Sequence, residues 1–261
     1  MKITLQILIV SLCLLVLSGC VSPFYQVPPE VYRERVKVLG VLPILVDAES
    51  TILHPQREEI VTILQQSATD KYLHLSEELS SSAGYTVVRP VIIDQKSELE
   101  LFSGSSLKSD KVGISRSYQP DPVAVSALTS SAGVDGLLVV ILNGVESPVK
   151  RWERLGPRNL TDKFNDIQAS AMVMAATGEI LWERPGANGD PFVVLQYPDF
   201  DEAFYNRTDE VAVHFVTPDG LRRALLAAEK GPFDKETFPI LYRRLFATLS
   251  ESLAVGKLWR N

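Results

Sequence analysis

Few residues of this 261-residue sequence are spaced for catalysis or metal binding. The three histidines, His54, His74 and His214, are far apart, and none belongs to a pairing that places two metal ligands on one helix face. Ser103-Gly104-Ser105 does not match a nucleophile elbow. Val38 to Val41 lacks the second and third glycines of a phosphate-cradling loop. The sequence therefore predicts no catalytic residues, no cofactor and no metal.

An acidic stretch between positions 199 and 210 is interleaved with aromatic side chains. Its members are Asp199, Phe200, Asp201, Glu202, Phe204, Tyr205, Asp209 and Glu210. Their spacing does not match the twelve-residue calcium loop, and this favours a solvated loop over a cation site. Because aromatic side chains are enriched at protein interfaces, a second interpretation is a partner-binding edge that includes Phe200 and Tyr205.

A second candidate surface contains Arg151, Trp152 and Arg154. Arginine and tryptophan often anchor protein interfaces, so these three are candidate partner-binding residues. The alternative, which we favour from the sequence, is that Trp152 covers one end of the core and that both arginines are solvated.

The first twenty residues have the parts of an export signal. Lys2 precedes an apolar run over positions 3–17, and small residues follow it. The run is shorter than the roughly 20 residues of a transmembrane span, although an uncleaved anchor helix is the alternative. The motif Leu17-Ser18-Gly19-Cys20 resembles the lipobox of bacterial lipoproteins. This resemblance implies cleavage between Gly19 and Cys20 and acylation of Cys20.

Acylation would hold the chain at a membrane. Each buried methylene contributes roughly 0.8 kcal/mol, and one acyl chain alone holds only marginally, so two or three chains on Cys20 make the attachment effectively permanent. An aspartate after the cysteine would resemble an inner-membrane retention signal, whereas this chain has Val21. We therefore expect lipid anchoring in the outer membrane, with the domain facing the periplasm. Residues 20–35 contain three prolines and predict a non-helical tether.

Cysteine content and charge exclude several classes of protein. Cys13 lies in the leader and Cys20 is taken by lipid, so the domain has no thiol for a disulfide, thiolate catalysis or a cysteine-rich zinc site. The formal net charge is −6, whereas nucleic-acid binding requires a basic face, so nucleic acid is not an expected partner. Hydrophobic residues make up 46% and charged residues 22%, which is ordinary globular usage.

Hydrophobic periodicity predicts an α/β domain over residues 36–261. Strands are expected at 36–44, 85–93 and 136–142, with a hairpin over 166–183 that turns at Thr177-Gly178. Helices are expected at 54–83, 122–132 and 236–255. A surface loop is expected at 103–118, and 185–219 is left unassigned. The order of elements predicts a single domain with a mixed central sheet flanked by helices.

This order of parts resembles two groups of envelope lipoproteins. The residues that carry the resemblance are Val38 to Pro43, Val134-Asp135-Gly136, Ala176 to Trp182 and the terminal amphipathic helix. They are similar to the curli-secretion lipoprotein family and to lipoproteins with a domain like the amino-terminal domain of the Tol-system propeller protein. The resemblance implies assembly or stabilisation of an envelope complex, through the sheet edge or the loops. It implies no individual functional residue. Pore-forming strands are not expected, because no pair of long segments alternates apolar and polar residues.

Two classes of function follow. The first is a lipid-anchored scaffold or assembly factor for an envelope or secretion complex, which binds an envelope protein noncovalently and is compatible with oligomer formation. The second is a small-molecule or glycan binder, or an unrecognised hydrolase, and it requires a deep pocket with clustered polar side chains.

Overall fold

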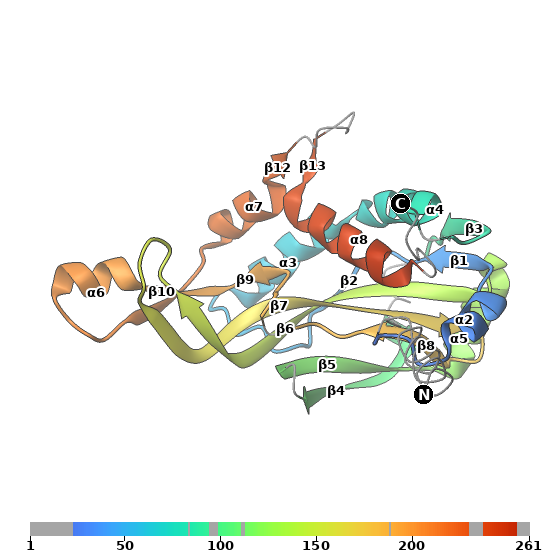
Figure 1. Ribbon diagram of the computed structural model, residues 1–261, viewed down its shortest axis with the longest axis horizontal. Coiled ribbons are helices and arrows are strands. Elements are labelled where there is room, and N and C mark those ends of the chain that lie inside the picture. The colour runs from blue at the N-terminus through green and yellow to red at the C-terminus, as the bar shows by residue number, and fades with distance from the viewer. Residues whose placement is uncertain are drawn as a thin grey trace, which may run out of the picture.

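A mixed β-sheet forms the centre of the protein (Figure 1). The computed structural model describes residues 23–82, 84–93, 99–110, 113–187, 189–229 and 237–254. The predicted leader, the predicted cleavage between Gly19 and Cys20 and the predicted acylation of Cys20 lie outside these residues. The predicted α/β class with a mixed sheet flanked by helices is confirmed.

The sheet has the strand order β3-β1-β6-β7-β8. Its strands are β1 (Val38–Val41), β3 (Val87–Pro90), β6 (Gly136–Trp152), β7 (Asn159–Ala175) and β8 (Ile180–Arg184). The strands β3, β1 and β6 run parallel, whereas β6, β7 and β8 are antiparallel neighbours. Two short strands extend it: β2 (Leu45–Asp47) pairs with β6, and β9 (Val193–Val194) pairs with β7. Because β6 and β7 have 17 residues each, their hairpin reaches well beyond the other strands.

Both faces of the sheet are covered, so the protein has three layers (Figure 1). One face carries α3 (Arg57–Ala68), α4 (Lys71–Ser82), α7 (Pro218–Leu226) and α8 (Ile240–Leu253). The other carries α5 (Pro122–Ala132), a short 3₁₀ helix (Leu99–Leu101) and a hairpin of β4 (Phe102–Asp110) and β5 (Gly113–Pro120).

The strand at the centre of these layers is apolar on both sides, as predicted. Along β6, Leu138 and Val140 pack under the four helices, whereas Leu137 and Val139 pack towards α5 and the β4–β5 hairpin. All four are at most 1% exposed. Strand side chains alternate between faces, so a continuous apolar run is required where both faces are buried.

The helix predicted over 54–83 is two helices, and this prediction was wrong. The chain breaks after α3 at Thr69, and Asp70 has a φ of +60°, before α4 starts at Lys71. Leu64 and Leu75, eleven residues apart, both pack in the same core. Eleven residues make about three helical turns, so the apolar pattern keeps its phase across the break and hides it.

The surface loop predicted at 103–118 was also wrong, because these residues form most of the β4–β5 hairpin. Its contacts with the sheet include polar ones: the Tyr118 hydroxyl donates to Asp47 Oδ2 at 2.9 Å, and Gln168 Nε2 donates to the Ile114 carbonyl at 3.1 Å. Strands that pack partly through polar groups lack the regular apolar alternation by which strands are recognised.

The predicted α5 is confirmed at both ends. Asp121 Oδ1 accepts hydrogen bonds from the backbone nitrogens of Val123 and Ala124 at 2.8 and 2.9 Å, which is an N-cap. Gly133 ends the helix with a φ of +61°, a conformation that glycine adopts without steric cost.

Residues 24–35, which were expected to be a non-helical tether, pack against the domain. Pro29 starts α2 (Pro29–Arg35), because proline is tolerated in a first helical turn. Tyr32 is 1% exposed, and its hydroxyl lies 2.6 Å from the Tyr85 hydroxyl. The Gln26 nitrogen donates to the Leu181 carbonyl at 2.9 Å. The folded unit therefore begins before residue 36.

The remaining predictions concern the carboxyl-terminal half. The hairpin that turns at Thr177-Gly178 is confirmed, and Gly178 has a φ of +79°. The last predicted helix is α8, which starts four residues later than expected, at Ile240. In the unassigned region 185–219 the structure adds β10 (Gln196–Asp199), α6 (Phe200–Asn206) and β11 (Ala212–Phe215). A short ladder of β12 (Ala228–Glu229) and β13 (Phe238–Pro239) precedes α8. Among the described residues, no helix is both long and apolar enough to cross a membrane.

Candidate functional site

The far end of the β6–β7 hairpin and the β10–α6–β11 segment together project from the layered body (Figure 1). We call residues 146–164 and 196–215 the distal arm. The strands β10 and β11 pair antiparallel, with Tyr197 opposite His214 and Asp199 opposite Ala212. The helix α6 connects them and lies at the extreme left of the view in Figure 1.

Arg158 ties the two parts of the distal arm together. Its Nη2 donates to Glu153 Oε1 at 2.6 Å within the hairpin and to the Phe200 carbonyl oxygen at 2.9 Å. Its guanidinium carbon lies 5.4 Å from the centre of the Phe200 ring. The hydrogen bond from Arg158 lowers the pKa of Glu153 below its usual value. The Arg158 side chain thus joins the hairpin to the start of α6.

A second set of hydrogen bonds fixes the base of the distal arm. The Asn165 backbone nitrogen donates to Gln196 Oε1 at 2.7 Å, which joins β7 to β10. The Asn165 side chain accepts from the Leu53 nitrogen at 2.9 Å and donates to the Thr51 carbonyl at 2.7 Å. Asn165 is itself fully buried. Since a buried amide is costly unless it is satisfied, these bonds hold the base in one arrangement.

The outer surface of the distal arm is rich in exposed apolar side chains. These are Trp152 (60% exposed), Leu155 (96%), Tyr197 (43%), Phe204 (67%) and Tyr205 (80%). Among the described residues, every exposed phenylalanine, tyrosine and tryptophan lies in the distal arm. The rings of Phe204 and Tyr205 contact each other edge to face at 5.5 Å, and the Lys150 ammonium lies 4.4 Å from the Trp152 ring.

The candidate partner-binding residues divide into two groups. Trp152, Arg154 and Tyr205 are exposed on the distal arm, so Trp152 does not cover the core. Arg151 and Phe200 point inwards: the Arg151 side chain is 14% exposed and pairs with Asp166, and Phe200 is 6% exposed. The expectation that Arg151 is solvated was therefore wrong.

The sequence interpretation missed two exposed residues of this surface, Leu155 and Tyr197. No periodicity marks either of them, because Leu155 lies in the turn of the hairpin and Tyr197 in a strand of only four residues. Their exposure depends on how far β6 and β7 extend from the body, which the apolar pattern of 136–142 does not indicate.

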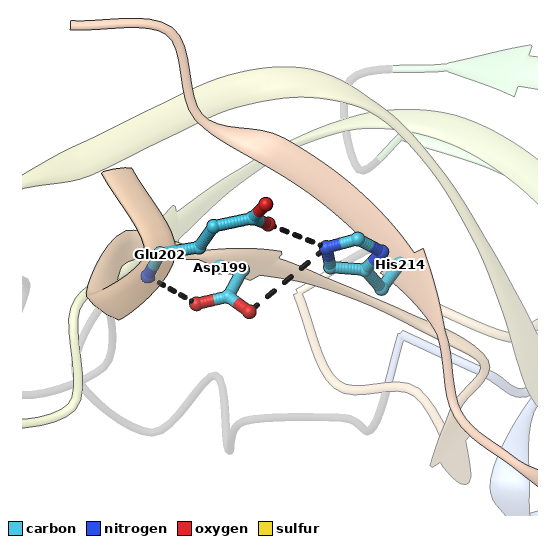
Figure 2. A group of neighbouring side chains, drawn as sticks. All are labelled: Asp199, Glu202 and His214. Atoms are coloured by element: carbon cyan, nitrogen blue, oxygen red, sulfur yellow. Dashed lines mark hydrogen bonds and ion pairs between the residues drawn. The ribbon is translucent and has the colours of Figure 1, made fainter. Parts of the chain in front are cut away.

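Three side chains with metal-ligating atoms meet on the distal arm (Figure 2). His214 Nε2 lies 3.0 Å from Glu202 Oε2 and 3.9 Å from Asp199 Oδ2. Asp199 Oδ1 accepts a hydrogen bond from the Glu202 backbone nitrogen at 2.8 Å, which caps α6 and fixes the Asp199 carboxylate relative to the Glu202 backbone. The ring of Tyr197 lies 6.0 Å from the imidazole.

The three histidines thus have different surroundings. His54 is 5% exposed, and its Nε2 is bonded to the Val216 carbonyl at 2.9 Å, which is a structural role. His74 lies on the surface of α4, with the Phe238 ring 4.6 Å away and, among the described residues, one carboxylate beside it, that of Glu77 at 3.9 Å. Only His214 has two carboxylates beside it among the described residues.

Two hollows in the body bear on the alternative of a small-molecule binder or hydrolase. One, of about 250 Å³, lies beside β2 and α3, and Asp70 is the one carboxylate among the described residues that line it. The other, of about 390 Å³, lies between the β4–β5 hairpin and β8, and Glu183 is the one carboxylate among its described lining residues. Within the described part of the chain, neither hollow brings together the pair of carboxylates that glycoside hydrolysis commonly uses.

Comparison with known proteins gives distant similarities. No family model and no curated protein matches the sequence. A structure from Helicobacter pylori, described as a homologue of the neuraminyllactose-binding hemagglutinin, is 7% identical with a TM-score of 0.39, over 85% of this chain and 87% of the other. The PelC dodecamer from Paraburkholderia phytofirmans is 11% identical with a TM-score of 0.23, over 59% and 74% of the two chains. At these identities and TM-scores the comparisons assign the chain to no family.

Proposed function

We propose that this protein is a lipid-anchored envelope protein that acts as a scaffold or assembly factor and binds a partner protein noncovalently through the distal arm. The anchor is Cys20, and the proposed location is the outer membrane with the domain facing the periplasm. The proposal assigns no catalytic residue to the chain.

One observation carries the binding part of this proposal: the exposed aromatic side chains of the described residues all lie in the distal arm. Exposed aromatic residues that gather in one region are typical of protein interfaces, because their large apolar surfaces gain most from being covered. The distal arm adds Arg154 beside Trp152, a combination that often anchors an interface.

The construction of the distal arm also supports a binding role. Its shape is held by Arg158 and by the buried Asn165, so the exposed side chains are presented by an ordered support. Preorganised surfaces lose less conformational freedom when they bind. Without this support, the cost of ordering the arm would reduce the affinity for a partner.

Site-specific photocrosslinking in living cells tests the proposal. A photoreactive phenylalanine analogue replaces Leu155 or Tyr205 on the distal arm, and Ile92, which is 87% exposed just after the edge strand β3, is the matched control. We expect positions 155 and 205 to yield adducts with the same envelope protein and position 92 to yield none. Replacement of Trp152 by alanine should reduce the yield from position 155 several-fold.

Three results would contradict the proposal. The first is an absence of adducts from positions 155 and 205, and the second is an identical adduct from position 92. The third is an adduct that contains only two copies of this chain, because the distal arm would then be a contact between copies and not a site for another protein.

A further inference from the structure

We propose that Asp199, Glu202 and His214 form a binding site for one zinc ion on the distal arm (Figure 2). The proposal does not rest on partner binding, because it follows from the geometry of these three side chains alone. The sequence interpretation treated the acids as a solvated loop and His214 as isolated, because the spacing of these residues along the chain matches no known metal-binding motif.

The chemistry of the donor atoms favours zinc. Zinc accepts imidazole nitrogen and carboxylate oxygen, and its sites often use three protein ligands with water in the fourth position. Calcium and magnesium prefer an all-oxygen set of six or more ligands, which a histidine does not complete. One imidazole and two carboxylates therefore match zinc better than they match either of the alkaline-earth ions.

The distances fit a tetrahedral site. Zinc bonds to nitrogen and oxygen are about 2.0–2.1 Å long, so two ligand atoms of one tetrahedron lie about 3.3 Å apart. His214 Nε2 lies 3.0 Å from Glu202 Oε2 and 3.9 Å from Asp199 Oδ2, on either side of that value. All three ligand atoms lie within 4.8 Å of one another. Small side-chain rotations are enough to place them around one ion.

The backbone holds the ligands in position. Antiparallel pairing places His214 opposite Tyr197, so the imidazole is diagonal to Asp199 on the same face of the β10–β11 ladder. The cap of α6 brings Glu202 to the same place, because Asp199 Oδ1 is bonded to the Glu202 nitrogen while Oδ2 faces the imidazole. The ligands thus come from three elements that meet at one point.

Exposure and charge leave room for the ion. The side chains of His214, Asp199 and Glu202 are 45%, 29% and 47% exposed, so a water ligand reaches the fourth position from solvent. The two carboxylates offset the charge of a divalent cation. A bound ion would join α6 to β11 and would hold α6, which carries the exposed Phe204 and Tyr205, against the ladder.

Zinc titration by calorimetry tests this site. The full-length chain is purified without a histidine tag and titrated with zinc chloride, and the variants are His214→Ala and Glu202→Gln. The matched control is His74→Ala, because His74 is also about half exposed, at 54%, but has one acid beside it among the described residues, Glu77. Circular dichroism and thermal melting confirm that each variant is folded.

We expect one zinc ion per chain, and binding at least about tenfold weaker in both site variants, since even the loss of an outer-shell partner costs about 10–100-fold. His74→Ala should bind as the natural chain does. Zinc should also slow hydrogen exchange of residues 199–215 in the natural chain and not in His214→Ala. The proposal is wrong if the natural chain binds no zinc, or if His214→Ala and Glu202→Gln bind it with unchanged affinity and stoichiometry.

Discussion

The Arg151 guanidinium donates from Nη2 to both carboxylate oxygens of Asp166, each at 2.6 Å. Strand pairing places Val145 opposite Asp166 and Leu160 opposite Arg151, so the two partners are six positions apart along the hairpin. Six residues of straight strand span about 20 Å, which is too far for an arginine side chain. The contact therefore requires the hairpin to bend, as the curled β6 and β7 ribbons of Figure 1 show.

The Arg151–Asp166 pair is expected to stabilise the bent hairpin. The side chains are 14% and 4% exposed, and the Arg151 guanidinium carbon lies 4.4 Å from the ring of Phe164. Burial raises the pKa of Asp166 above its usual range, while Arg151 acts in the opposite direction. Removal of the cation would leave a buried carboxylate without its partner.

We therefore predict that Arg151→Ala lowers the free energy of unfolding by about 3 kcal/mol, as expected for one lost partner of a buried ion pair. Urea denaturation measures this change. Arg154→Ala, at an exposed position of the same segment, should change it by less than about 0.5 kcal/mol. The double replacement Arg151→Met with Asp166→Leu should recover most of the loss. Equal stability of Arg151→Ala and Arg154→Ala would show that the pair contributes nothing.

The link between the hairpin and α6 is expected to depend on pH. Arg158 lowers the pKa of Glu153 from its usual value of 4.5, so the folded protein stabilises the charged carboxylate. With a lowered folded-state pKa, the stabilisation is present above about pH 4.5 and is lost as the pH falls through the folded-state value. The attachment of α6 should therefore weaken on acidification below about pH 4.5.

Hydrogen exchange with mass spectrometry measures this effect. After correction for intrinsic rates, amides of α6 should exchange about two- to fivefold faster in Arg158→Ala than in the natural chain at neutral pH, as expected for a partly exposed pair near the surface. In Arg158→Ala, lowering the pH should increase the exchange rate of the α6 amides only a little further. The helix α8 is the internal reference, because its first turn has no acidic residue whose protonation would change the exchange of its amides. Equal exchange of α6 in both proteins would disprove the link.

Gly144 allows a close approach between β6 and the segment after β2. A Cβ atom at Gly144 would lie 2.5 Å from the Thr51 carbonyl oxygen, whereas one at Gly104 would meet nothing within 4 Å. The Gly144 nitrogen also donates a hydrogen bond to Ser50 Oγ at 2.8 Å, which holds the two segments together. The backbones must separate to admit a methyl group at this position.

Gly144→Ala should therefore lower the free energy of unfolding by about 1–3 kcal/mol, the usual cost of overpacking. Gly104→Ala, the control in another strand, should stay within about 0.5 kcal/mol of the natural chain. Thermal melting of both variants compares them directly. A loss of the same size in both would mean that the added methyl group, and not the contact with Thr51, is responsible.

The lipid anchor is tested with the two cysteines of the chain. Cys20→Ala should abolish labelling with radioactive palmitate and move the protein from the membrane fraction to the soluble fraction, because in the proposed anchor the acyl chains on Cys20 supply the attachment. Cys13→Ala should leave labelling and fractionation unchanged, since Cys13 lies within the predicted leader. Persistent labelling of Cys20→Ala would rule out the assignment.

The sequence by itself determined the elements whose signals are local. Asp121 and Gly133 marked the ends of α5, because a capping carboxylate and a left-handed glycine act within one turn. The apolar run at 136–142 indicated a strand covered on both faces, since burial on both sides leaves no position for a polar residue. With the other predicted strands and helices, their order along the chain was sufficient for the α/β class.

The tertiary structure alone decided which distant residues meet. The β4–β5 hairpin was missed because it packs partly through polar groups, and Arg151 was taken as solvated because its partner Asp166 becomes a neighbour only when the hairpin bends. Likewise, Asp199 and His214 are 15 positions apart and meet through the register of β10 and β11. Strand register and bending depend on contacts between remote segments, and no local pattern of residues encodes those contacts.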